Sequence, residues 1–146
     1  MIASLFADTN LLIYTLDPAD PLKQARAFAI VEQGVASGRL VTSPQSLNEC
    51  YQVMAMKRRL AIPETARSFV ASLFPTCRAE MNLETIALAW EIEAETRFGW
   101  WDSLLVASAV RHGCTHFLTE ALSDGRRVRG MTLLNPFTND VSSLLS

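Results

Sequence analysis

Residues 2–10 read Ile-Ala-Ser-Leu-Phe-Ala-Asp-Thr-Asn, a short apolar run that stops at three polar residues. Such a run predicts a buried strand, because a strand covered on both faces of a sheet is apolar throughout. The polar residues predict a turn, with Asp8 directly beyond the carboxyl end of the strand. Ligands of open α/β sheets bind at that edge, which makes Asp8 the first candidate site residue.

Helical and strand patterns alternate along the rest of the chain. Helix starts are marked by Pro21, Ser43-Pro44 and Pro63, since Ser caps first-turn amides and Pro suits the first helical position. We expect helices over about 11–16, 21–35, 44–59, 63–74, 83–98 and 101–112, and strands over 2–7, 40–42, 76–78, 116–119 and 128–134. This order predicts one α/β domain over residues 1–146, a three-layer α/β/α sandwich with a central, mainly parallel sheet.

The composition is that of a folded chain, with 49% hydrophobic and 19% charged residues. The sequence contains neither an apolar run of membrane-spanning length nor the features of a signal peptide, so we expect a cytoplasmic protein without membrane contact. The net charge of −2 means that any nucleic acid must bind local basic clusters. Two such clusters are 57–59 and 126–129, which a solvated surface explains equally well.

Three cysteines, Cys50, Cys77 and Cys114, are odd in number and widely spaced, which predicts neither a disulfide framework nor a zinc knuckle. His112, Cys114 and His116 suggest zinc only superficially. The first of the two histidines ends a predicted helix and the other begins a predicted strand, so their side chains need not converge.

Asp102 begins the most apolar helix pattern in the chain, with no Lys or Arg nearby in sequence. An ionised carboxylate in such surroundings requires a partner, a cap or a metal ion. Glu49 shares a helix face with Val53 and Met56 and is therefore not plainly a surface charge. Ordinary structural roles remain open at each position: a turn or helix cap for Asp8, a helix N-cap for Asp102, and a solvated helix face for Glu49.

Glu120 and Asp124 follow the 116–119 strand, so they too lie in a loop at the carboxyl edge of the sheet, where ligands bind. A polar turn before Gly125 is the alternative. Carboxylates that converge from several elements have one shared explanation, which is binding of divalent ions that activate water and stabilise charge on a phosphate.

Other enzyme classes fit less well. Dehalogenase-like phosphatases have a second Asp two residues after the first, where this chain has Asn10. The chain lacks the acidic pair and the late lysine of a phosphate-receiver domain. Gly-rich phosphate loops and the G-x-S-x-G elbow are also missing, which disfavours nucleotide hydrolysis and serine hydrolase chemistry.

Five short motifs resemble the PIN-domain pattern in their order and spacing. These are Asp8-Thr9-Asn10, Leu47-Asn48-Glu49, Trp101-Asp102-Ser103-Leu104-Leu105, the Thr119 to Gly125 loop, and Asn135-Pro136-Phe137. The last two also resemble the toxin members of VapBC-type toxin–antitoxin pairs. The similarity covers nearly the whole chain.

The resemblance implies a ribonuclease toxin that cleaves RNA with Mg²⁺ or Mn²⁺, forms a homodimer and is held inactive by a cognate antitoxin protein. By residue, it implies that Asp8, Glu49 and Asp102 hold the metal, with supporting roles for Asn10 and Ser103.

One position departs from the resemblance. Relatives with this loop read Thr-Glu-Asp, whereas Ala121 stands in place of that Asp. Glu120 or Asp124 then completes the catalytic set, with a slight preference for Glu120, or the second metal site is weak. The alternative function is a PIN-like module that binds RNA or a protein and has lost efficient catalysis.

Overall fold

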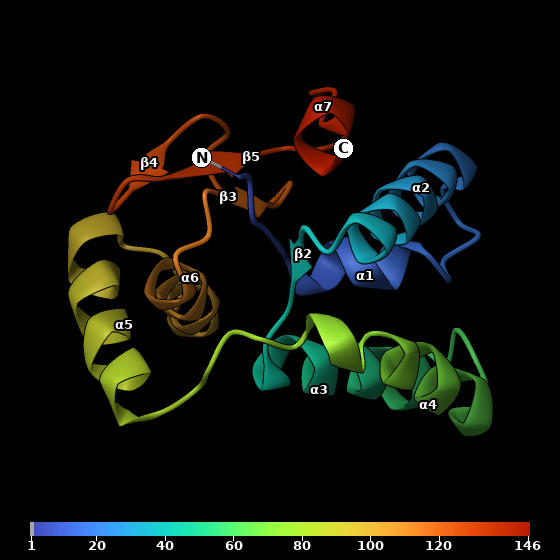
Figure 1. Cartoon of the computed structure of the whole chain (residues 1–146). Helices are drawn as coiled ribbons and strands as arrows, with labels where there is room; N and C mark the ends of the chain where they lie inside the picture. The colour runs from blue at the N-terminus through green and yellow to red at the C-terminus, as the bar shows by residue number, and fades with distance from the viewer. Residues whose placement is uncertain (1) are drawn as a thin grey trace.

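The computed structural model describes residues 2–146. Within them a five-stranded sheet has the order β2-β1-β3-β5-β4 (Figure 1). The strands are β1 (Leu5–Ala7), β2 (Leu40–Val41), β3 (His116–Leu118), β4 (Arg127–Val128) and β5 (Met131–Leu134). β1 pairs in parallel with β2 and β3, β3 pairs in parallel with β5, and β4 is antiparallel to β5. The mainly parallel sheet is therefore confirmed.

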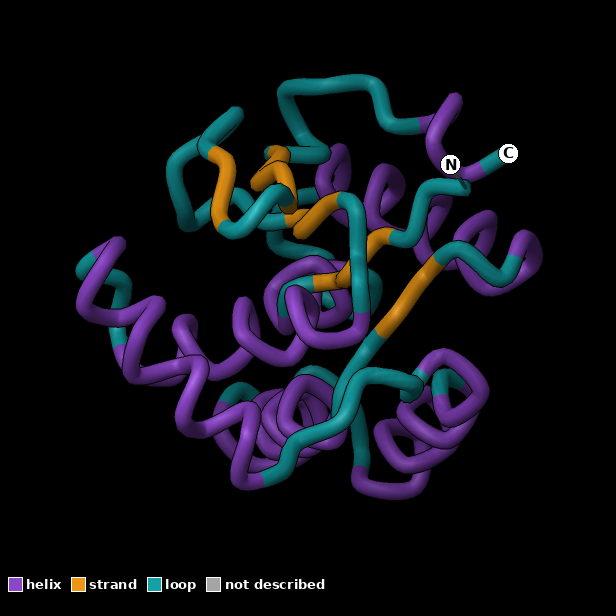
Figure 2. Tube along the Cα trace, turned by 60° about the vertical axis from the view of Figure 1, so that its left-hand side comes forward, coloured by secondary structure: helices purple, strands orange, loops and turns teal. Residues whose placement is uncertain are grey.

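Helices cover both faces of the sheet, as Figure 2 shows around the orange strands. One face packs against α1 (Thr9–Tyr14), α2 (Pro21–Ser37), α3 (Pro44–Gln52), α4 (Pro63–Ser72) and α7 (Ser142–Leu145), and the other against α5 (Leu83–Thr96) and α6 (Trp100–His112). Alternation along β1 supplies both cores, because Leu5 and Ala7 join the first core and Phe6 the second. The three-layer α/β/α architecture is confirmed.

The second core centres on an aromatic pair. The rings of Phe6 in β1 and Phe117 in β3 stack with centroids 5.2 Å apart and planes 7° apart. In α6, residues 103–109 are all buried, which explains why this helix is apolar almost all round.

Local sequence signals account for several helix ends. Ser43 and Ser46 form a reciprocal capping box at the start of α3, and Pro44 occupies its first turn. Gly113 ends α6 at φ 88°, a left-handed conformation that glycine adopts without strain. The predicted starts at Pro21 and Pro63 are likewise confirmed.

Three sequence expectations are wrong in detail. The segment 128–134 is a hairpin rather than one strand, because Arg129 and Gly130 both have positive φ and turn the chain between β4 and β5. The segment 76–78 contributes a single parallel bridge, Thr42 to Cys77, after the short 3₁₀ turn η2 (Phe74–Thr76). The α-helix expected over 44–59 ends at Gln52 and continues as the π-helical turn η1 (Val53–Lys57).

The sheet register places the ends of the two central strands side by side. Ala7 of β1 lies opposite Leu118 of β3, and the Asp8 amide donates to the Leu118 carbonyl at 3.1 Å. The residues immediately after these strands, Asp8 and Thr119, therefore meet at the carboxyl edge of the sheet. No helix in the described part of the chain is both long and apolar enough to cross a membrane.

Candidate active site

A cleft of about 590 Å³ opens beyond the carboxyl end of β1. Its walls come from the start of α1, the exposed side of α3 and η1, and the first turns of α6. The lining residues are Asp8, Thr9, Asn10, Ile13, Gln45, Asn48, Glu49, Gln52, Val53, Lys57, Trp101, Asp102 and Leu105. Asp8, Glu49 and Asp102, far apart in sequence, thus face one space.

Asp8 is 5% exposed and both of its carboxylate oxygens accept hydrogen bonds. Oδ1 accepts from the Thr9 amide at 2.7 Å, which caps α1, and Oδ2 accepts from the Thr119 hydroxyl at 2.8 Å. Burial raises the pKa of Asp8 from its ordinary 3.8 to about 6, and the charges of Asp102 and Glu49 add to the rise. The two hydrogen bonds lower the pKa but do not offset these effects. Asp8 therefore caps α1, and its ionised form is destabilised by burial and by the neighbouring carboxylates.

Glu49 is held in place by neutral donors on two elements. The Thr9 hydroxyl donates to Oε2 at 3.1 Å, and Gln45 Nε2 donates to Oε1 at 3.0 Å. The same Gln45 nitrogen donates to the Trp101 carbonyl at 3.1 Å. Gln45 thereby connects Glu49 of α3 to the start of α6, the helix that carries Asp102.

Asp102 lies in the first turn of α6, but it is not the N-cap, which is Gly99. Partial burial raises the pKa of Asp102, and the nearby Glu49 charge raises it further. Ser103 is fully buried behind it, and its hydroxyl donates to the Phe98 carbonyl at 3.4 Å. Asn10 is exposed on the cleft wall.

The three carboxylates fit a divalent cation by their chemistry. Carboxylate oxygens are the ligands that Mg²⁺ and Mn²⁺ prefer, and a cation would offset the burial and the mutual repulsion that raise the pKa values of Asp8 and Asp102. Across residues 2–146, no Lys or Arg forms an ion pair with any of the three. The described residues contain no group of three or more His, Cys, Asp or Glu side chains placed to hold a metal ion by themselves.

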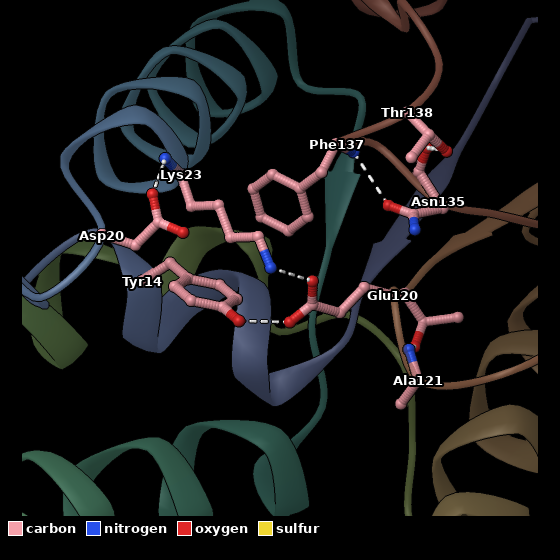
Figure 3. Close-up of polar contacts among 9 residues, drawn as sticks. Tyr14, Asp20, Lys23, Glu120, Ala121, Asn135, Phe137 and Thr138 are labelled. Atoms are coloured by element: carbon pink, nitrogen blue, oxygen red, sulfur yellow. Dashed lines mark hydrogen bonds and ion pairs between the residues drawn. The ribbon is translucent and has the colours of Figure 1, made fainter.

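Glu120 lies in a different cluster, shown in Figure 3. Its carboxylate accepts from Lys23 Nζ at 2.7 Å and from the Tyr14 hydroxyl. Lys23 Nζ also lies 5.2 Å from the Tyr14 ring centroid and 5.3 Å from that of Phe137. Burial raises the pKa of Glu120, but the hydrogen bonds from Lys23 and Tyr14 outweigh it and the pKa is lowered overall. Glu120 does not line the cleft.

Asp124 is exposed and closes the turn after β3. Its Oδ1 accepts from the Asn135 amide at 2.8 Å, and both oxygens accept from Asn139 Nδ2 at 3.2 Å. These hydrogen bonds lower the pKa of Asp124. The polar turn considered from the sequence is therefore present, and Asp124 is not among the cleft residues.

Thr9, Gln45 and Thr119 contact the carboxylates and were not identified from the sequence. Thr119 could have been found, since it follows the end of β3 as Asp8 follows β1. Gln45 lies four residues before Glu49 on α3, a spacing that brings the two side chains together, whereas only the tertiary structure brings Gln45 to the Trp101 carbonyl.

The basic cluster 57–59 divides between two roles. Lys57 lines the cleft, whereas Arg58 forms an ion pair with Asp17 at 2.7 Å. In the second cluster, Arg129 forms an ion pair with Glu95.

Cys114 is buried and its sulfur accepts from the Ser4 hydroxyl at 3.7 Å, while His116 Nδ1 contacts the Thr115 hydroxyl at 2.8 Å.

Comparison with known proteins agrees with this fold. The crystal structure of VapC20 from Mycobacterium tuberculosis, described as a toxin that cleaves the sarcin-ricin loop, matches with a TM-score of 0.58 and 20% sequence identity. The match covers 78% of this chain and 87% of that one, and at this identity it shows a shared fold. No curated protein matches the chain. The family model for the PIN domain matches residues 5–121, and the chain therefore belongs to the PIN domain family.

Proposed function

We propose that this protein is a metal-dependent endoribonuclease whose catalytic centre is the cleft between Asp8, Glu49 and Asp102. The observation that carries the proposal is the placement of three carboxylates, one directly after β1 and the others in α3 and α6, in one cleft with no ion-pair partner among residues 2–146. A bound cation would offset both the cost of burying Asp8 and Asp102 and the repulsion between the carboxylates.

In the proposed mechanism, Asp8, Glu49 and Asp102 would hold Mg²⁺ or Mn²⁺, directly or through its bound waters. When bound, the cation would supply activation of water at neutral pH and charge stabilisation at the phosphate. Thr119 and the Thr9 amide fix the two oxygens of Asp8, and Gln45 with the Thr9 hydroxyl fixes those of Glu49. Lys57, at the end of η1, lines the cleft, where it would contact an RNA phosphate. Hydrolysis adds water across one phosphodiester P–O bond.

The biological setting we propose is that of a type II toxin with a cognate antitoxin. The similarity in fold to VapC20, a protein described as a toxin, supports this setting, as do the VapBC-like loop motifs. Location in the cytoplasm and a homodimeric state belong to the same proposal.

A second candidate function is a PIN-like module that binds RNA or a protein with little turnover. Ala121 favours it, since the acidic residue of similar loops is missing there. The hydrogen bonds from Lys23 and Tyr14 to Glu120 favour this second function as well, because they hold the Glu120 carboxylate away from the place of the Asp that is missing at position 121. Under this alternative, Glu120 and Asp124 have structural roles.

One cleavage assay separates the two functions. Purified protein is incubated with RNA in Mg²⁺ or Mn²⁺, with and without EDTA, and compared with Asp8→Asn and Asp102→Asn. The matched control is Asp140→Asn, since Asp140 is an exposed carboxylate bound to the Ser142 amide. The endoribonuclease requires loss of cleavage with EDTA and in both cleft variants but not in the control. RNA binding that persists without turnover at any metal concentration supports the second function.

A further inference from the structure

Trp101 is an exposed aromatic residue at the carboxylate cleft. It directly precedes Asp102 in α6, lines the cleft, and is 64% exposed. The preceding Trp100, by contrast, packs against the core beneath α6. An indole left in solvent beside a polar site offers a flat apolar surface that the folded chain does not itself use.

Amide side chains line the cleft next to this indole. Gln45, Asn48 and Gln52 recur along the cleft side of α3, where each presents donors and acceptors. Gln45 donates to the Trp101 carbonyl at 3.1 Å and so fixes the start of α6 against α3. The Gln45 Oε1 atom is buried and has no hydrogen-bond partner in the described chain, so one acceptor in this wall is unsatisfied.

The cleft also has a positive charge. Lys57 ends η1, the π-helical turn that follows α3, and lines the same cleft. Glu49 lies between Gln45 and Lys57 in the sequence, one turn from Gln45. The cleft therefore presents an aromatic residue, amides, carboxylates and a positive charge. Aromatic residues combined with a positive charge along a groove are characteristic of sites for single-stranded nucleic acid.

We propose that Trp101 is a substrate-binding residue that stacks on an unpaired base of the RNA beside the phosphate to be cleaved. Such a stack requires that the nucleotide beside the phosphate to be cleaved is unpaired. A base inside a duplex is covered on both faces by its neighbours and cannot lie on the indole, whereas a base in a loop or a single strand can. The assignment of RNA as the ligand rests on the proposed function above.

The test measures RNA affinity without cleavage. Full-length Asp8→Asn protein in Mg²⁺ is titrated into a fluorescein-labelled, 12-nucleotide RNA of mixed sequence, either single-stranded or annealed to its complement, and anisotropy is recorded. Trp101→Ala and Trp101→Phe are introduced in this background. Trp90→Ala is the matched control, because Trp90 in α5 is 61% exposed but does not line the cleft.

Trp101→Ala is expected to weaken binding of the single strand roughly 10-fold, the usual effect of losing one base–aromatic stack. Trp101→Phe keeps a ring and stays within about 3-fold of the parent, and Trp90→Ala within about 2-fold. Duplex affinity is unchanged by Trp101→Ala. Equal single-strand affinities for the parent and Trp101→Ala overturn the inference, as does an equal loss in Trp90→Ala. Thermal unfolding of each variant verifies that it is folded.

A cleavage measurement separates this inference from the proposed function. With Asp8 restored, Trp101→Ala should raise KM more than it lowers kcat, because stacking is present both before and during the reaction. A wild-type protein that cleaves no RNA, while binding still depends on Trp101, defeats the nuclease proposal and leaves the stacking role standing. Cleavage with unchanged KM in Trp101→Ala defeats the stacking role alone.

Discussion

The Thr119 hydroxyl donates a hydrogen bond to Asp8 Oδ2 at 2.8 Å and joins the ends of the two central strands. The Thr119 hydroxyl oxygen in turn accepts a hydrogen bond from the Ala121 amide at 3.1 Å. The backbone of position 121 is therefore two hydrogen bonds from the most buried carboxylate of the cleft. Position 121, where similar loops have an Asp, is therefore connected to the carboxylate cleft through Thr119.

Replacing Ala121 with Asp should strengthen metal binding. An added carboxylate in this loop contributes attraction for a divalent cation beside Asp8, so half-maximal cleavage should need about 10-fold less Mg²⁺. The measurement is cleavage rate against Mg²⁺ concentration. Ala121→Asn, similar in size and uncharged, is the control. An Asp variant no better than the Asn variant would show that position 121 does not reach the metal.

Removing the Thr119 hydroxyl should weaken the site without unfolding the chain. In Thr119→Val the donor to Asp8 is lost, the pKa of Asp8 rises further, and the proton competes better with the metal. A fall of about 10-fold in metal affinity is typical when a residue that orients a ligand is lost. Isothermal titration with Mn²⁺ measures it. Thr119→Ser keeps the hydroxyl and should bind like the wild type; a Val variant with unchanged affinity contradicts the prediction.

Asp8 should make the metal-free protein less stable as the pH rises. Its pKa is about 6 in the folded chain and near 3.8 when unfolded, so between these values the folded state binds more protons. Stability from this group is fully present below about pH 4 and is lost as the pH passes 6, on the order of 2–3 kcal/mol in total.

Asp8→Asn removes this titration. In EDTA the variant should therefore have a higher free energy of unfolding than the wild type at pH 7.5 and a similar one at pH 4, as urea denaturation would show. Equal stability of the two proteins at both pH values would mean that folding does not raise the pKa of Asp8.

The Lys23–Glu120 pair should act as a structural tie between α2 and the loop after β3. Lys23→Met and Glu120→Gln each remove the ion pair, so their effects on Tm should be non-additive in the double variant. Each single change is expected to lower Tm by about 2–4 °C. Differential scanning calorimetry of the four proteins gives the coupling. Strictly additive shifts would show that the pair contributes nothing, as holds for many surface ion pairs.

Periodicity and capping residues were sufficient to predict most of the fold. Alternation of apolar strands with amphipathic helices predicted the three layers, and Ser43-Pro44 and Gly113 marked helix ends. The errors have local causes. Arg129 and Gly130 turn the chain at positive φ, which the apolar pattern of 128–134 does not reveal. A two-residue strand such as β4 is likewise too short for any periodic signal.

The candidate site was predicted in part, and the division follows from how each residue reaches the cleft. Asp8 and Asp102 are placed by their own elements, one by a strand end and the other by the first turn of a buried helix, so the sequence by itself determined their positions. Tertiary structure decided the partners that are distant in sequence: Thr119 meets Asp8 through strand register, and Gln45 of α3 meets the Trp101 carbonyl at the start of α6.

The same distinction separates Glu120 from the cleft. From the sequence, Glu120 and Asp8 both follow strands and have equal claims to the binding edge. Only the folded chain places Lys23 and Tyr14 beside Glu120, where two donors stabilise its charge, while Asp8 is left among other carboxylates. Sequence position determined which side chains reach the edge of the sheet, and packing decided which of them retain an unneutralised charge, because neutralisation depends on neighbours that are distant along the chain.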